Sequence, residues 1–207
     1  ELEHDNLRAA MDWSVDNGEV DTAARIVGSL ADWGYFRARY ELAEWSERTV
    51  ALAGPAHPGW FALCGAAARG AWVLSRFDDA HRFALQAGDG DGPTVARSGH
   101  PGDVAADVAL YRGDTEAARR HYLRHRELAL DGDDPIRQSW TTYYLSVVAA
   151  VTRRWDEAAA WAREALDPAR ASGNPTALAY ALYANGLASK HRDPDNAIAL
   201  FDEAIRV

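Results

Sequence analysis

The sequence has very little lysine, cysteine or methionine: its 207 residues include one of each, Lys190, Cys64 and Met11. A single cysteine excludes a disulfide within the chain. Cys64 stands beside Gly65 and Ala66, small residues that suit a tightly packed helix. We therefore expect a buried, reduced thiol in a cytoplasmic setting.

Positive charge is also scarce. The 22 Lys and Arg residues are outnumbered by 31 Asp and Glu residues, which gives a formal net charge of -9. Because affinity for nucleic acid depends mainly on clustered Lys and Arg, this balance argues against direct nucleic-acid contact. No apolar run approaches the roughly 20 residues that a membrane helix needs, and no signal segment opens the chain. We expect a protein that neither spans a membrane nor is exported.

Motifs for common catalytic chemistry are missing as well. The sequence contains no Gly-x-Ser-x-Gly nucleophile elbow and no Gly-x-x-x-x-Gly-Lys-Ser/Thr phosphate loop. Cys64 has no evident base partner. We therefore predict that this chain has no catalytic residue, binds no cofactor and is not an enzyme.

Two short motifs suggest metal binding, and each is incomplete. Asp89 and Asp91 have the spacing of calcium ligands, but the twelfth position of such a loop, normally glutamate, is His100. His121 and His125 lie one helical turn apart, as zinc ligands can, but no third ligand is evident nearby. We interpret the first motif as a flexible connector and the second as part of a helix face, and we predict no metal site.

The strongest positive feature is an internal repeat. An alanine recurs at intervals of 37, 38, 40 and 39 residues, and a small or fairly small residue precedes each by twelve positions. In tetratricopeptide-type repeats, two antiparallel helices cross where both side chains are small. This period predicts an all-α fold, a right-handed α-solenoid of tetratricopeptide-like helix pairs. The recurring alanines are Ala43, Ala80, Ala118, Ala158 and Ala197, and the preceding residues are Ala31, Ala68, Ala106, Ser146 and Asn185.

Capping residues and glycines set the expected helix boundaries. Asp134, Asn174 and Asp193 each precede a proline, which is the pattern of a helix start. The expected stops are five glycines, at positions 18, 54, 88, 113 and 173. We expect about eleven helices and no strand. They divide into a lead-in helix within 1–18, five pairs at about 19–53, 59–87, 102–130, 135–171 and 175–206, and a flexible loop at 88–101.

A solenoid of this kind offers a binding groove rather than a deep pocket. The first helix of each pair is expected to line the concave side, with the residues near its crossing position directed into the groove. Aromatic rings there provide large contact area at small entropic cost, which suits a peptide, a protein segment or a small-molecule inducer. The alternative is that these rings pack between repeats. The candidate groove residues are Arg25, Asp32, Tyr35, Phe36, Arg69, Trp72, Asp103, Asp107, Tyr111, Trp140, Tyr143, Tyr180, Tyr183 and Lys190.

The opening segment from Leu2 to Trp13, LEHDNLRAAMDW, carries a resemblance to a known family. It resembles the segment that leads into tetratricopeptide-like repeats in bacterial STAND-class ATPases, such as transcriptional regulators of the LuxR/MalT and SARP/AfsR types. The resemblance implies a sensor module whose repeats bind an inducer or partner and contact an upstream nucleotide-binding domain. The chain starts without methionine and stops inside a helical pattern, so we expect it to be a piece of a longer protein.

These observations favour a non-catalytic, protein- or ligand-binding repeat domain that acts as the sensor of a STAND-type transcriptional regulator. Any ATPase activity would then belong to the upstream domain. One alternative is a stand-alone tetratricopeptide adaptor that assembles protein complexes. A less favoured alternative is a helical toroid hydrolase with a carboxylate pair such as Asp103 and Asp107, which would need more helices than the repeat supplies.

Overall fold

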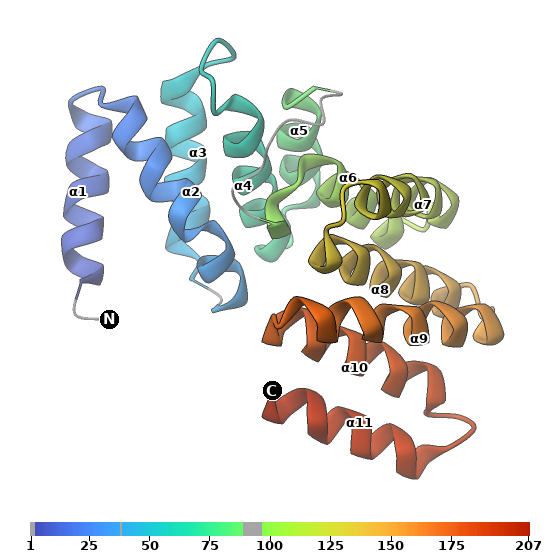
Figure 1. The fold of residues 1–207 in the computed structure, drawn as a ribbon. Helices are drawn as coiled ribbons and strands as arrows, with labels where there is room; N and C mark the ends of the chain where they lie inside the picture. Colours follow the sequence, from blue (N-terminus) through green and yellow to red (C-terminus); the bar gives the residue numbers. More distant parts are fainter. Residues whose placement is uncertain (1–2, 38, 89–96) are drawn as a thin grey trace. The chain divides into compact units, whose positions relative to one another are not determined.

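The computed structural model is helical throughout the residues it describes, which are 3–37, 39–88 and 97–207 (Figure 1). Eleven α-helices and one short 3₁₀ turn, and no strand, occur in these segments. The all-α prediction of tetratricopeptide-like helix pairs is confirmed. The helices are α1 His4–Asp16, α2 Val20–Phe36, α3 Glu41–Ala53, α4 Trp60–Val73, α5 Phe77–Gln86, α6 Pro101–Tyr111, α7 Thr115–Asp131, α8 Pro135–Val151, α9 Trp155–Ser172, α10 Pro175–Ser189 and α11 Pro194–Arg206, with η1 at Arg97–Gly99.

The chain forms two compact units, a first unit Glu1–Val108 and a second unit Ala109–Val207. Their boundary falls inside α6, and each unit is a stack of helices that contact their neighbours in sequence. In the first unit α3 packs against both α2 and α4, and α4 packs against α5. In the second unit α8 packs against α7, α9 and α10, and α10 also packs against α9 and α11. No helix among the described residues is long and apolar enough to cross a membrane.

The predicted caps and stops are confirmed. The side chains of Asp134, Asn174 and Asp193 each accept a hydrogen bond, of 3.0, 3.0 and 3.1 Å, from the backbone N–H three residues later. A proline follows each cap at the first helical position, where its missing N–H leaves no helical bond unmade. The five predicted glycine stops all have positive φ, between 62° and 89°, which favours glycine over other residues. They are Gly18, Gly54, Gly88, Gly113 and Gly173.

The recurring alanines form the contacts between helices. All five are buried, and so are four of the five small residues that precede them. In the fourth pair the Ser146 hydroxyl donates a hydrogen bond to the Ala158 carbonyl, 2.9 Å away on the facing helix. The first pair differs, because Ala31 is only half-buried. At Gly34 of the same helix a Cβ atom would clash with the Leu42 side chain, so this glycine is also part of the contact between α2 and α3.

The lead-in helix is part of the first unit's structure. Met11 of α1 is fully buried and belongs to the core of this unit. Two polar contacts join α1 to α3: Arg48 Nη1 lies 2.7 Å from Asp12 Oδ1, and His4 Nε2 lies 3.1 Å from Glu41 Oε1. These contacts fix α1 against the first helix pair.

Two ion pairs with the same offset in sequence link α7 and α9 in the second unit. Arg119 and Glu157, on α7 and α9, are 3.2 Å apart and 38 residues apart in sequence. Arg126 donates from Nε to Glu164 across the same two helices at 2.6 Å, again with an offset of 38. Two ion pairs with the same spacing in sequence therefore join α7 to α9.

The predicted loop at 88–101 is described only at its ends. Asp89 and Asp91 lie outside the described residues, so the calcium motif stays untested there. Residues Arg97–Gly99 form the 3₁₀ turn, and α6 begins at Pro101, one residue before the predicted start.

Candidate binding surface

Five of the predicted groove residues in the first unit form one internal network around Arg69. The Arg69 side chain is 3% exposed and forms an ion pair with Asp107, at 2.7 Å between Nη1 and Oδ2. Arg69 Nε also donates to the carbonyl oxygen of Ser98 at 2.6 Å, and the Ser98 N–H donates to Asp32 at 3.0 Å. These bonds tie η1 to helices α2, α4 and α6 and satisfy a buried cation.

Two aromatic rings complete this network. The guanidinium carbon of Arg69 lies 5.2 Å from the ring centre of Tyr35 and 5.1 Å from that of Trp72, within cation–π range. The structure therefore brings together five of the predicted groove residues: Asp32, Tyr35, Arg69, Trp72 and Asp107. They contact one another, however, and the buried ion pair shows that this assembly is part of the packing of the unit.

A pocket beside this network is too small for an inducer. It lies between α2, α3 and α4 and is lined by residues that include Tyr35, Arg39, Tyr40 and Arg69. The space there that a water-sized molecule can occupy is about 30 Å³. This is about the volume that one water molecule takes up in the liquid, whereas small-molecule sites have volumes of several hundred Å³.

The other predicted residues of the first unit are scattered. Arg25 and Phe36 are exposed on α2. Asp103 is fully buried at the start of α6, with its carboxylate 4.0 Å from Nδ1 of His100. No contact joins Arg25 to the Arg69 network among the interactions of the described residues.

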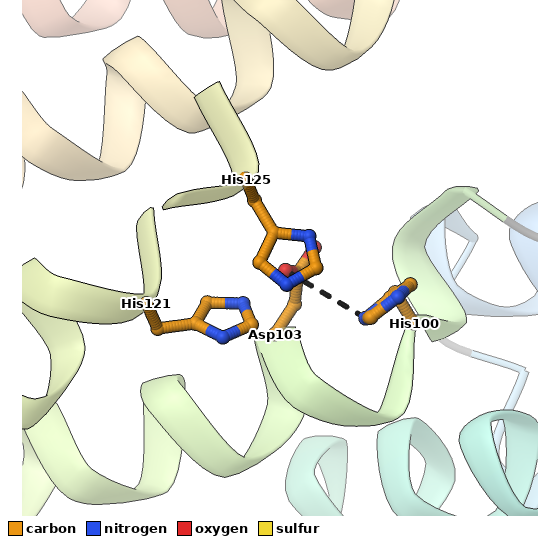
Figure 2. A group of neighbouring side chains, drawn as sticks. All are labelled: His100, Asp103, His121 and His125. Atoms are coloured by element: carbon orange, nitrogen blue, oxygen red, sulfur yellow. Dashed lines mark ion pairs between the residues drawn. The ribbon is translucent and has the colours of Figure 1, made fainter. Parts of the chain in front are cut away.

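Figure 2 draws His121 and His125, which the sequence analysis interpreted as part of a helix face, together with His100 and Asp103. His100 and Asp103 belong to the first unit. His121 and His125 are on α7 in the second unit, with their rings stacked at 4.1 Å, and His125 Nδ1 lies 3.2 Å from an Arg137 nitrogen. Each unit thus contributes two such ligands, fewer than the three or four of a protein zinc site. Neither pair by itself supports a metal assignment.

The second unit gathers three predicted groove residues into an aromatic cluster. Trp140 and Tyr143 on α8 meet Tyr180 on α10, with ring centres 5.3 Å apart for Trp140–Tyr180, 5.0 Å for Tyr143–Tyr180 and 6.2 Å for Trp140–Tyr143. The first two contacts are edge-to-face, the favoured geometry for aromatic pairs. We name Trp140, Tyr143 and Tyr180 the aromatic face.

The aromatic face packs on buried rings and is itself partly exposed. Tyr144 stacks on Tyr122 of α7 at 4.5 Å and touches Trp140 at 5.3 Å, and both tyrosines are buried. Trp140 is 9% exposed, and its indole N–H has no acceptor among the described residues. Tyr143 and Tyr180 are half-buried. The face therefore has a buried base and two partly exposed tyrosine side chains.

The remaining predicted residues of the second unit lie apart from this face. Tyr183 contacts Phe201 of α11 at 5.8 Å between ring centres. Tyr111 and Lys190 are exposed near helix ends. Ser98, Tyr122 and Tyr144 take part in the two clusters but are not among the predicted residues. Tyr122 and Tyr144 have a sequence signal, because they extend the apolar stripes of α7 and α8.

Cys64 and Glu157 are among the groups whose pKa values are shifted. Burial raises the pKa of the Cys64 thiol to about 11, so the nucleophilic thiolate is strongly disfavoured at neutral pH. For Glu157 burial acts to raise the pKa, but hydrogen bonds from Trp161 and Arg119 and the charge of Arg154 outweigh it and lower the pKa. The buried cysteine fits the prediction, and Glu157 is held ionised as part of an ion pair.

Known proteins resemble this chain only in structure. No model of a known protein family matches the sequence, and no curated protein matches it. The crystal structure of BtubC (BKLC) from P. vanneervenii is 19% identical, and the match covers 95% of this chain and 90% of that chain with a TM-score of 0.63. That of YrrB, a TPR protein with an unusual peptide-binding site, is 16% identical over 95% of this chain and 91% of that chain, with a TM-score of 0.48.

These likenesses bear on the fold alone. The helix pairs, the period near 39 residues and the buried alanines at the crossings define the class, a tetratricopeptide-like helical repeat. Repeats of this class pack each unit against its neighbours only and present extended surfaces.

Proposed function

We propose that this chain is a non-catalytic binding domain that recognises a peptide segment of a partner protein on the aromatic face of α8 and α10. The observation that carries the proposal is the edge-to-face cluster of Trp140, Tyr143 and Tyr180, with two tyrosine rings accessible above a buried base. Tyrosine combines large contact area with a hydroxyl group and loses little entropy on binding.

The geometry favours a peptide over a small molecule. Ring centres 5.0 to 6.2 Å apart are in contact, so no ligand fits between them and the face must be approached from its edge. The indole N–H of Trp140 is a buried donor that lacks an acceptor in the described part of the chain. Because this N–H is buried, a ligand meets the aromatic face through Tyr143 and Tyr180, whose side chains are partly exposed.

We further propose that this domain is the sensor of a STAND-type transcriptional regulator. The resemblance of the opening segment supports this role. The folding of His4–Asp16 as a helix fixed on the first pair is consistent with a lead-in that transmits movement. Nucleotide and DNA contacts would then belong to other domains of the protein. The stand-alone adaptor has the same fold and the same aromatic face, and differs in having no nucleotide switch.

The binding proposal is tested with peptides selected on the immobilised chain from a random display library. Tyr143→Ala combined with Tyr180→Ala removes both accessible rings, and we expect a loss of affinity of tenfold or more, about 1.4 kcal/mol or above. The control is Trp161→Ala, which removes a half-buried ring from α9, outside the aromatic face. Equal binding to the double variant and the parent chain would refute the assignment.

Trp140 itself is a poor probe of binding. Because its side chain is buried, Trp140→Ala leaves a cavity and costs about 3–5 kcal/mol of stability. A loss of binding in that variant would not separate contact from unfolding.

The regulator role needs a separate experiment on the full-length protein. We expect ATP or ADP to copurify with it, and the affinity for the selected peptides to differ between the two nucleotide states, since coupling requires different contacts in each. Peptide affinity that is the same with either nucleotide, or a protein without a nucleotide-binding domain, would instead support the adaptor.

A further inference from the structure

We infer that the first unit has a binding site of its own, a hollow beside α2 that takes a small zwitterion of the free amino acid class. Five of its lining residues are on α2, and the sixth is in the turn between α3 and α4. We name it the α2 hollow. It is distinct from the aromatic face and does not depend on the function proposed above. The lining residues are Asp21, Ala24, Arg25, Gly28, Ser29 and His57.

The α2 hollow lies on the side of α2 that faces α4. Farther along this side, Ala31 and Tyr35 line the smaller pocket described above together with residues of α4. They follow Ala24 and Gly28 by seven residues, so all four share one side of the helix. The neighbour on this side is therefore α4, a helix that is present in the structure and packs against α2. The hollow is open beside it, at the turn that leads into α4.

The size of the α2 hollow suits a small molecule. The space that a water-sized molecule can occupy there is about 380 Å³, against about 30 Å³ in the pocket beside Arg69. Small-molecule sites begin at about 300 Å³. Ala24 and Gly28 keep the wall formed by α2 free of bulky side chains. A ligand of few atoms therefore fits, in contact with the polar groups around it.

Arg25 and Ser29 provide hydrogen-bond donors for a carboxylate. They are four residues apart and therefore neighbours on the surface of α2. Neither side chain forms a hydrogen bond or an ion pair with the described residues, whereas the hydroxyls of Ser14, Ser46 and Ser189 donate to the carbonyl four residues before. An arginine can bind a carboxylate through two parallel N–H donors. These two side chains are thus available to a ligand.

Asp21 provides an acceptor one helical turn before Arg25. The Gly59 N–H donates to His57 Nδ1 at 3.0 Å, so the ring proton is on Nε2, which donates to Asp21 Oδ1 at 3.0 Å. The His57 side chain is only 11% exposed, whereas that of Asp21 is 87% exposed. A nearly buried ring therefore holds an exposed carboxylate in place by one oxygen and leaves the other oxygen open to a ligand.

The two charges define the class of ligand. An acidic and a basic residue four apart on a helix commonly pair with each other, but Asp21 is bound to His57 and Arg25 has no partner among the described residues. A free amino acid carries an ammonium group close to a carboxylate and so complements both charges. A phosphate dianion would be attracted by Arg25 and repelled by Asp21. We therefore assign the α2 hollow to a zwitterion.

The probe is a mixture of the free protein L-amino acids, added to the chain and followed by saturation-transfer difference NMR. The amino acid with the strongest signal is then titrated by calorimetry. Arg25→Gln removes the cation from an exposed position, and we expect it to weaken binding at least about tenfold. The matched control is Arg37→Gln, at an exposed arginine just after α2 whose side chain also has no partner among the described residues. This control should bind as the unmodified chain does.

Two analogues and one further variant separate the α2 hollow from other sites. The amine that lacks the carboxylate and the acid that lacks the ammonium group should each bind at least about tenfold more weakly than the amino acid. The double variant Tyr143→Ala, Tyr180→Ala should bind it unchanged. Absence of binding, or equal affinity of the Arg25→Gln and Arg37→Gln variants, would overturn the inference. An acid that binds as tightly as the amino acid would overturn it too, because Asp21 would then take no part.

Discussion

The Ser146 hydroxyl donates a hydrogen bond to the Ala158 carbonyl across the crossing of α8 and α9, at 2.9 Å. Both residues are buried, so the space between these two helices is set by a hydroxyl and a methyl group. We predict that Ser146→Leu lowers the free energy of unfolding by about 1–3 kcal/mol, because the larger side chain forces the helices apart.

Ser146→Ala is the control for that substitution. It removes the hydrogen bond and keeps the size, and its expected cost is about 1 kcal/mol. Urea denaturation followed by circular dichroism measures both values. A leucine variant as stable as the alanine variant would contradict close packing at this crossing.

Gly70 on α4 provides a test in which two effects have opposite signs. In a helix, glycine to alanine normally stabilises by about 1 kcal/mol. A Cβ atom at position 70, however, would lie 2.7 Å from the Cβ and 2.8 Å from the Cα of Ala43. This Cα belongs to the backbone of α3, so it cannot move aside as a flexible side chain could. We predict that Gly70→Ala is destabilising overall. Thermal unfolding of Gly70→Ala with and without Ala43→Gly measures this, and the second substitution should restore part of the loss if the contact is the cause.

Glu157 makes the stability of the fold depend on pH in the acidic range. Its pKa is below the ordinary 4.5, as hydrogen bonds from Trp161 and Arg119 outweigh its burial. A carboxylate with a lowered pKa in the folded state stabilises the fold above its unfolded pKa, and the contribution disappears as pH falls through the folded value. We predict that Glu157→Gln is less stable than the parent chain at pH 7 and that the difference narrows below about pH 4.5. Unfolding curves at pH 7, 5 and 3 compare the two, and a difference independent of pH would exclude this ion pair as its origin.

Cys64 reports on the integrity of the first unit. With a pKa of about 11, nearly all of the thiol is protonated at pH 8, and the side chain is also buried. We predict negligible reaction with a thiol-specific reagent such as DTNB in the native chain at pH 8 and rapid reaction in 8 M urea. Rapid labelling without denaturant would show that α4 opens or that Cys64 is accessible.

Local signals predicted the repeat well. Proline after Asp134, Asn174 and Asp193 fixes three helix starts through short-range chemistry, and Gly173, with positive φ, ends the helix before the second of them. The first pair shows where this reasoning reaches its limit. Ala31, which the spacing favours, is only half-buried, whereas Gly34 lies so close to Leu42 that a Cβ atom there would clash.

The groove residues were harder to place, since their surroundings depend on contacts between repeats. A charged residue such as Arg69 is expected at the surface. Its burial depends on Asp107, which is 38 residues away, and on Ser98, whose carbonyl no side-chain pattern indicates. The aromatic face was predicted better, because Trp140 and Tyr143 lie on one helix and Tyr180 on the next equivalent helix. Whether any of these residues binds a partner stays a prediction.

The offset of 38 residues shared by Arg119–Glu157 and Arg126–Glu164 constrains how the length of this protein can change. Arg119 and Arg126 are seven residues apart on α7, and Glu157 and Glu164 are seven residues apart on α9, so each pair of residues shares one side of its helix. One residue inserted between Glu157 and Glu164 would turn one carboxylate by about 100° around α9 while the other kept its partner. In this part of the chain, changes of length should therefore fall in the turns rather than within α7 or α9.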